Sequence, residues 1–119
     1  MKKLFISFIL CFVFFLSKAQ TSIAPEDAKN YIGKTVTVCG KVKSTYQPNT
    51  KSHPTFIDFG NKYPNAVFSI VIWESDLSKF SYKPKKKLKR KHLCVTGVVK
   101  MYKDKPEIVV SDPSQIKIK

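Results

Sequence analysis

The stretch KTVTVCGKV, residues 34–42, alternates β-branched apolar residues with polar ones and carries a glycine near its end. This period of two is typical of a β-strand with one buried face. A similar stretch, HLCVTGVV, spans residues 92–99. Because a glycine inside a strand allows a bulge or a sharp bend, the two stretches predict long bent strands with bulges at Gly40 and Gly97. Such strands suit a small closed barrel.

Three further strand-like segments complete the predicted sheet, at residues 55–59, 66–73 and 107–110. Residues 25–32 predict a short helix, because a proline and two acidic residues stand in its first turn and Gly33 follows it. Ser75 is expected to cap a second short helix, 75–80, between the third and fourth strands. The predicted fold class is therefore all-β. It is a five-stranded OB-fold, a Greek-key barrel, with a short N-terminal helix and a short helix between strands 3 and 4.

The first 19 residues have the pattern of a secretory signal peptide. A basic start is followed by an almost wholly apolar run from Leu4 to Leu16, and small residues stand at Ser17 and Ala19. The apolar run is shorter than the roughly 20 residues that a membrane-spanning helix needs, so no permanent membrane anchor is expected. We expect cleavage after Ala19 and a single domain over residues 20–119. The protein is then exported, either to a periplasm or out of the cell.

Two cysteines, Cys39 and Cys94, remain after the signal peptide with Cys11 is removed. By strand alternation each shares its face with threonine, so in neighbouring strands the two sulfurs would meet on one face of the sheet. An oxidising compartment favours a disulfide between them, and two free thiols are the alternative. A metal site is not expected, because two lone cysteines without a histidine at ligand spacing do not form a tetrahedral ligand set.

From about residue 33 to 112 the chain resembles bacterial OB-fold nucleic-acid-binding domains of the tRNA-anticodon-binding-like type, in a small exported form. The resemblance is carried by three short segments, VCGKV at 38–42, TFIDFG at 55–60 and CVTGVV at 94–99. The second segment is similar to the anticodon-binding barrel of aspartyl-tRNA synthetases. That resemblance implies an outward-facing Phe56 that stacks on a base. Those synthetases continue with an arginine and an aspartate where this chain has Gly60 and Asn61, so anticodon-specific hydrogen bonding is not implied.

The chain is strongly basic, with 22 Lys and Arg against 8 Asp and Glu and a formal charge of +14. Loss of the signal peptide lowers this charge to +11, which still favours anionic partners. Residues 83–91 contain seven cations: Lys83, Lys85, Lys86, Lys87, Lys89, Arg90 and Lys91. Lysines suit diffuse attraction to phosphate or sulfate and not the planar recognition of a base edge. We expect this segment to bind a polyanion, with a solvated loop that keeps the domain soluble as the alternative.

Phe56 and Asp58 are the first candidates for ligand contacts on the barrel face. They lie two residues apart in one strand and therefore share a face, while Ile57 and Phe59 supply the inward pair. Phe56 is expected to stack on a base with Asp58 beside it. The alternative is a core aromatic with Asp58 capping the following turn.

Trp73 and Tyr46 are two further aromatic candidates. The third strand is expected to turn Phe68, Ile70 and Ile72 into the core, which leaves Trp73 outside as a second stacking surface. Trp73 is alternatively a cover for the following helix. Tyr46 lies in the loop predicted over residues 44–54, where it is either a ligand contact or an ordinary loop tyrosine.

No catalytic set is evident, so we expect a non-enzymatic protein without a cofactor or a metal. The chain has one arginine and two isolated histidines, and it contains no glycine-rich phosphate loop, Ser/His/Asp set or HExxH motif. The leading hypothesis is an exported OB-fold protein that binds single-stranded nucleic acid or another polyanion through the basic segment and the aromatic face. A second hypothesis is an envelope protein that binds a small ligand or a protein, with the lysines only solubilising. A third is a degenerate nuclease-like domain.

Overall fold

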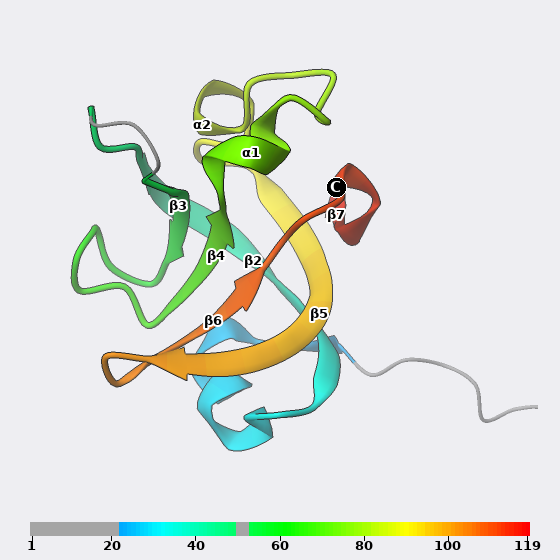
Figure 1. Ribbon diagram of the computed structural model, residues 1–119. Coiled ribbons are helices and arrows are strands. Elements are labelled where there is room, and N and C mark those ends of the chain that lie inside the picture. Colours follow the sequence, from blue (N-terminus) through cyan, green and yellow to red (C-terminus); the bar gives the residue numbers. More distant parts are fainter. Residues whose placement is uncertain (1–21, 50–52) are drawn as a thin grey trace, which may run out of the picture.

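The computed structural model describes residues 22–49 and 53–119 (Figure 1). Seven strands are present in this part of the chain: β1 (Ser22–Ile23), β2 (Thr35–Tyr46), β3 (Thr55–Phe59), β4 (Phe68–Ile72), β5 (His92–Tyr102), β6 (Lys105–Val109) and β7 (Ile116–Ile118). Short helices join them: η2 (Pro25–Tyr31), α1 (Glu74–Leu77), α2 (Pro84–Lys87) and η3 (Pro113–Gln115). Within these residues no helix is long and apolar enough to cross a bilayer.

Five of the strands close into the predicted barrel. The sheet order is β1-β2-β3-β4-β6-β5-β7, and an additional pairing of β2 with β5 closes it. Closure is possible because β2 and β5 are long, at 12 and 11 residues, and each pairs with different neighbours along its length. The pairing of β4 with β6 is parallel and the other pairings within the barrel are antiparallel. The five-stranded all-β barrel expected from the sequence is confirmed.

The first long strand differs from its prediction in length and in the place of its irregularity. It runs to Tyr46, so the following loop is shorter than expected, and its register shifts between Val42 and Ser44 instead of at Gly40. Gly40 has another role. A Cβ at Gly40 would stand 2.8 Å from the Cγ of Pro25, so the missing side chain lets the first helix pack against β2.

The connection between β4 and β5 holds two short helices where one was predicted. The first begins at Glu74, with Trp73 at its N-cap, so Ser75 lies inside this helix and does not cap it. The second lies within the basic segment and begins with Pro84, whose fixed φ suits a first helical position. Pro84 and Leu88 are buried and hold this segment against the barrel.

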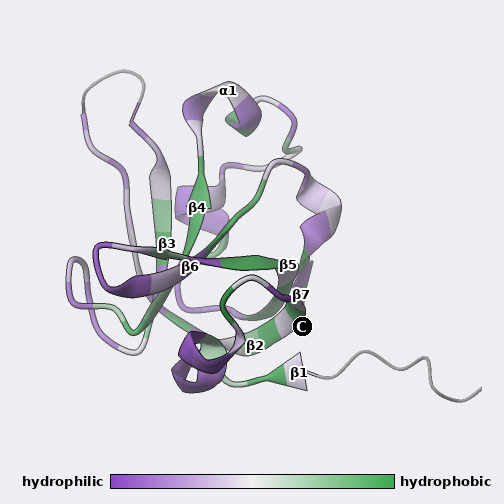
Figure 2. Cartoon of the chain, turned by 60° about the horizontal axis from the view of Figure 1, so that its bottom comes forward, coloured by the Kyte–Doolittle hydropathy of each residue, from purple (hydrophilic) through white to green (hydrophobic). Residues whose placement is uncertain are grey.

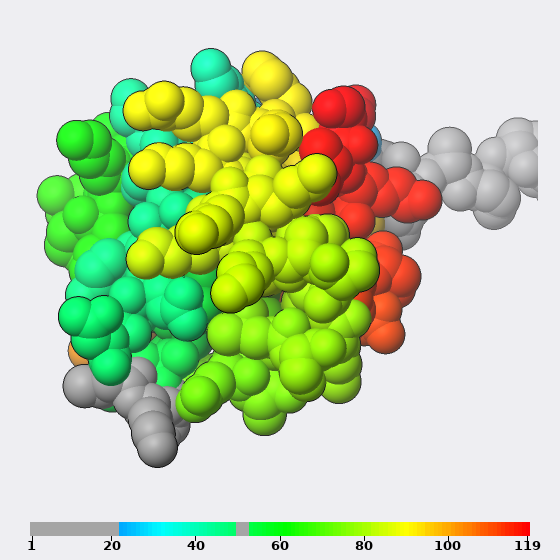
Figure 3. All heavy atoms as spheres, turned by 90° about the horizontal axis from the view of Figure 1, so that it is seen from above, coloured from blue at the N-terminus to red at the C-terminus, as the bar shows by residue number. Residues whose placement is uncertain are grey.

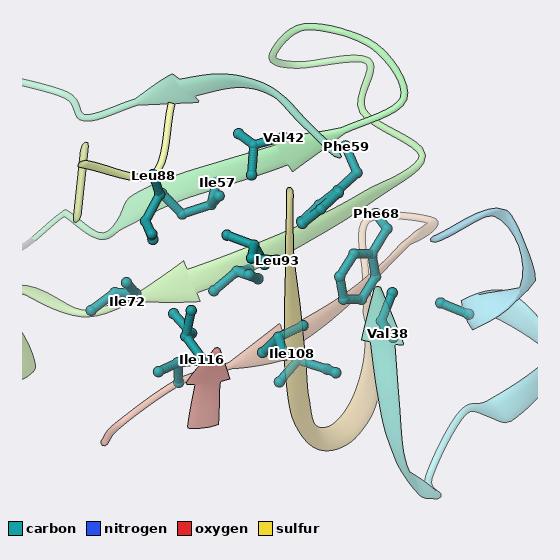
Figure 4. Close-up of a cluster of buried hydrophobic side chains, with 14 of the residues drawn as sticks. Val38, Val42, Ile57, Phe59, Phe68, Ile72, Leu88, Leu93, Ile108 and Ile116 are labelled. Carbon is teal, nitrogen blue, oxygen red and sulfur yellow. The ribbon is translucent and has the colours of Figure 1, made fainter. Parts of the chain in front are cut away.

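The core fills the inside of the barrel (Figure 4). Strands β3 and β4 turn Ile57, Phe59, Phe68, Ile70 and Ile72 into the core as predicted, and these five side chains are completely buried. The outer face of β4 is covered as well, because Ser69 and Val71 are also buried. Figure 2 shows hydrophobic residues along the barrel strands and hydrophilic residues along most of the connections. The alternation therefore separates an apolar inside from an outer face, which neighbouring side chains partly cover.

A disulfide joins Cys39 and Cys94, which settles the choice that the sequence left open. The two residues lie directly opposite each other in the antiparallel pair β2 and β5. Two pairs further along, and so on the same face, the hydroxyls of Thr37 and Thr96 are hydrogen-bonded at 2.8 Å between their Oγ1 atoms. The shared face predicted for cysteine and threonine is thus correct.

Candidate functional site

A groove of about 740 Å³ lies against the outer face of β3, β4 and β6. Its sides are formed by the connection between β2 and β3 and by the turn between β5 and β6. The residues that line it are Pro48, His53, Pro54, Phe56, Tyr63, Pro64, Val71, Trp73, Lys100, Met101, Tyr102, Lys103, Lys105, Glu107 and Val109. We call it the aromatic groove. Phe56 and Trp73 were predicted to contact a ligand and line the groove, whereas Asp58 and Tyr46, also predicted, do not. Tyr46 is the last residue of β2 and not part of a loop.

Strand register explains the apolar floor of the groove. Phe56 in β3 is paired with Val71 in β4, which in turn is paired with Val109 in β6. All three point away from the barrel core because they alternate with buried inward residues. Tyr46, on the other side, is paired with Phe56 across β2 and β3. A continuous apolar row thus crosses the outer face of four strands.

Tyr63, from the turn between β3 and β4, covers part of this row. Its ring stacks on Tyr46 with centroids 4.1 Å apart and an interplanar angle of 11°, and it lies 5.4 Å from the ring of Phe56. The Nζ of Lys105 stands 5.5 Å from the Phe56 centroid, within the range of a cation–π contact. Phe56 is therefore half-buried beneath the protein's own side chains. Its ring packs against Tyr46 and Tyr63 and is less open to stacking by a ligand than an exposed ring.

The exposed rings of the groove are Tyr63, Trp73 and Tyr102, which are 40%, 45% and 54% exposed. Tyr102 is the last residue of β5. Sequence reasoning missed Tyr63 and Tyr102, because neither falls in a segment that the period of two predicts as a strand. No pattern in the sequence linked them to Phe56 or Trp73.

Three lysines bring positive charge into the same groove: Lys100, Lys103 and Lys105. Lys103 and Asp104 have positive φ angles of 50° and 63° and make the tight turn that joins β5 and β6. The Nζ of Lys103 lies 5.4 Å from the ring centroid of Tyr102. Nothing in the order of residues favoured these lysines over the denser basic segment, so they were also missed.

Asp58 does not have the ligand-contacting role predicted for it. It faces away from the core as expected, but its neighbours cover it completely, and the hydroxyl of Ser69 donates a hydrogen bond of 2.6 Å to its Oδ1. Glu107, paired with Ser69 on the other side, is 7% exposed. Burial raises the pKa of Asp58 and of Glu107, and the charge of Lys105 partly opposes both shifts. Asp58 is therefore covered and is not a surface for a ligand, whereas Glu107 is a nearly buried acid in the lining of the groove.

The basic segment 83–91 lies at one end of the barrel and not in the aromatic groove. Figure 3 shows its side chains, in yellow, spread over this end. The backbone carbonyl of Lys85 accepts a hydrogen bond of 3.0 Å from Thr45 Oγ1, which ties the segment to β2. Lys83, Lys85 and Lys86 line a second depression of about 650 Å³ together with Gln47 and Thr55. The expected single site made of basic segment and aromatic face is thus divided, with the connection between β2 and β3 separating the two parts.

Arg90 belongs to a third depression. It lines a hollow of about 580 Å³ with Lys41 and Lys43 of β2 and with Lys62 of the turn between β3 and β4. The sequence had grouped Arg90 with its lysine neighbours. The structure instead joins it to cations from two distant segments.

No cluster of three or more His, Cys, Asp or Glu residues that could hold a metal ion occurs in residues 22–49 and 53–119. The groups that the groove does present are aromatic rings, which can stack on planar groups, and lysines, which attract anions.

Neither a family model nor a curated protein sequence matches the chain. Solved structures with a similar fold include asparaginyl-tRNA synthetase from Pyrococcus horikoshii, with a TM-score of 0.54 and 16% identity over 83% of this chain and 22% of that chain. Aspartyl-tRNA synthetase from Entamoeba histolytica is similar with a TM-score of 0.56 and 16% identity, over 86% of this chain and 22% of that chain. The chain therefore spans about a fifth of the length of the synthetases that it matches.

An OBody bound to hen egg-white lysozyme, OBody AM3L15, is similar over 87% of this chain and 96% of that chain, with a TM-score of 0.58 and 18% identity. At these identities the likeness concerns the fold. It confirms the OB-fold predicted from the strand order.

Proposed function

We propose that this protein is an exported, non-enzymatic OB-fold protein that binds single-stranded nucleic acid or a similar polyanion in the aromatic groove. The observation that carries the proposal is the meeting of three exposed rings, Tyr63, Trp73 and Tyr102, with three lysines from β5, β6 and the turn between them in a single groove. Bases stack on aromatic rings, and lysines beside the rings neutralise the phosphates between those bases. Double-stranded nucleic acid does not offer its base faces in this way.

The basic segment 83–91 has a supporting role in this proposal. Its cations are exposed at the end of the barrel, and they line a different depression from the rings. They attract a polyanion over distance and add contacts that do not depend on base sequence. Because lysine and stacking both tolerate any base, we expect little sequence specificity.

Export is proposed from the N-terminal pattern, whose residues lie outside the described part of the chain, and is supported by the disulfide. Disulfides persist in oxidising compartments and are rare in a reducing cytosol. The absence of a catalytic motif in the sequence supports a binding role. The similar folds of the two tRNA synthetases agree with a nucleic-acid partner.

One observation favours the alternative that the groove holds a protein partner or a small ligand. The OBody is similar over nearly its whole length, and that protein is bound to lysozyme. In this alternative the lysines only solubilise the domain. Replacement of the seven cations in segment 83–91 by glutamine would then leave partner binding intact.

The proposal is tested by two charge-matched triple variants, titrated with single-stranded DNA. The groove variant replaces Lys100, Lys103 and Lys105 by Gln, and the control replaces Lys85, Lys86 and Lys87 by Gln. Trp73 is the single tryptophan of the chain and lines the groove, so its fluorescence reports on binding there. We expect the groove variant to lose about 100-fold in affinity near 0.1 M salt, because three phosphate contacts contribute a salt slope of about 2.

The control variant is expected to bind more weakly but to keep the full quenching of Trp73 at saturation. Two results would contradict stacking in the groove: equal losses of affinity in the two variants, or quenching by heparin as strong as that by DNA. Either would show that charge alone explains the binding.

Incubation of the protein with DNA and calcium tests the nuclease-like alternative, for which cleavage of the DNA is the positive result.

A further inference from the structure

The depression that holds Arg90 gathers four cations from three separate parts of the chain. Lys41 and Lys43 stand on β2, Lys62 on the turn between β3 and β4, and Arg90 between α2 and β5. All four are exposed, and the depression has a volume of about 580 Å³. We call it the arginine depression.

Packing fixes the backbone that carries three of these cations. Val42 is buried in the core at 1% exposure, so its neighbours Lys41 and Lys43 both point outward. The backbone N–H of Val42 donates to the carbonyl of Lys91 at 2.9 Å, which fixes the residue after Arg90 against β2. Arg90 itself has a φ of 62°, an uncommon conformation for a residue with a side chain.

The charge of the depression is largely uncompensated. None of the four cations forms an ion pair with a carboxylate of the described residues. Glu26 is the one acidic residue in the lining. Four cations around one acid repel one another, and a bound anion with several charges relieves this repulsion. Arg90 is the single arginine among the 22 basic residues, and its planar fork matches two oxygens of a phosphate where a lysine is a point charge.

The arginine depression and the aromatic groove meet at one turn. Lys62 lines the depression, and the next residue, Tyr63, lines the groove and stacks on Tyr46. This turn, between β3 and β4, projects from the side of the barrel in Figure 1. A strand whose base stacks on Tyr63 therefore needs only to pass around the turn to bring its next phosphates to Lys62 and Arg90.

We propose that the arginine depression is a phosphate-binding site that receives the backbone of the same single strand and extends the interface beyond the aromatic groove. This inference rests on the proposed function. It predicts that affinity depends on the length of the ligand, because a short oligonucleotide fills the groove alone. A longer one reaches the depression as well.

The test compares oligothymidylates of about 4 and about 16 nucleotides, the limits of what one such barrel covers. The depression variant replaces Lys41, Lys43 and Arg90 by Gln, the control replaces Lys85, Lys86 and Lys87 by Gln, and a third variant is Arg90→Lys. For the depression variant we expect unchanged binding of the short ligand. For the long ligand we expect about a 100-fold loss near 0.1 M salt, with a salt slope lower by about 2. Arg90→Lys is expected to lose part of this affinity although it keeps the charge.

Three results would overturn the inference: the same loss for both lengths, the same length-dependent loss in the control, or no advantage of the long ligand in the unmodified protein. If the short ligand does not quench Trp73, the proposed function fails instead. A second probe, tripolyphosphate, has no bases and therefore tests the arginine depression without the aromatic groove. When it is added, the changes in the protein's amide chemical shifts should centre on Lys41, Lys43 and Arg90. Changes confined to residues 83–87 would contradict the site.

Discussion

Removal of the disulfide by the double substitution Cys39→Ser and Cys94→Ser should be the most costly change outside the core. The bond joins β2 and β5, the two long strands whose pairing closes the barrel. It links positions 55 residues apart, so it restricts about half of the unfolded chain. The folded register is already set by the hydrogen bonds on both sides of the bond. Most of the effect is therefore expected in the unfolded state.

The loop-closure model gives the magnitude. For a closed loop of 55 residues, the lost chain entropy corresponds to about 4 kcal/mol of unfolding free energy at room temperature. Small domains have a total unfolding free energy of roughly 5–15 kcal/mol. The reduced protein is therefore expected to keep its fold in buffer but to unfold at a much lower concentration of urea.

Urea denaturation followed by Trp73 fluorescence and by far-ultraviolet circular dichroism measures this loss. The unmodified protein is compared with and without a reductant, and the double variant serves as the matched control because a reductant should leave it unchanged. A loss below about 1 kcal/mol, with coincident two-state transitions, would refute the reasoning from loop entropy.

Three further changes test the packing and the two buried acids. Leu88→Ala should lower the unfolding free energy by about 3 kcal/mol, because Leu88 is fully buried beneath the basic segment, and a loss near zero in urea denaturation would contradict its anchoring role. Gly60→Ala should cost more than about 1 kcal/mol, since Gly60 has a φ of 88° and a Cβ there would lie 2.5 Å from Val67; an unchanged melting temperature would count against this. Burial raises the pKa of Asp58 and Glu107, so the folded state is stabilised by the protonated forms of these carboxyl groups. This contribution to the unfolding free energy is fully present below the ordinary pKa values of 3.8 and 4.5, and it is lost as the pH rises through the higher folded pKa. The variant Asp58→Asn with Glu107→Gln should therefore gain stability relative to the unmodified protein as the pH rises through this window, and a difference independent of pH would argue against the shifts.

Much of the barrel could be predicted because strand alternation is a local property. The period of two in residues 55–59 assigned Ile57 and Phe59 to the core and Phe56 to the outer face, and the structure agrees. The same reasoning placed Cys39 and Cys94 on one face. Helix positions were predicted less well, because a helix of four residues, such as Pro84–Lys87, is stabilised by the burial of its proline and of Leu88 and not by its own sequence.

Strand alternation could not predict which residues line the groove. Tyr63 lies in the turn between β3 and β4, and Tyr102, 39 positions later, is the last residue of β5. They line one groove only because the parallel pairing of β4 with β6 brings that turn and the end of β5 to the same side of the barrel. The burial of Asp58 likewise depends on Ser69 in another strand. Density of charge along the chain predicted the basic segment as the site, yet in the folded barrel that segment lines a separate depression from the rings. Periodicity along a chain reveals which side of a strand is apolar, but contact between distant side chains depends on how the strands are paired.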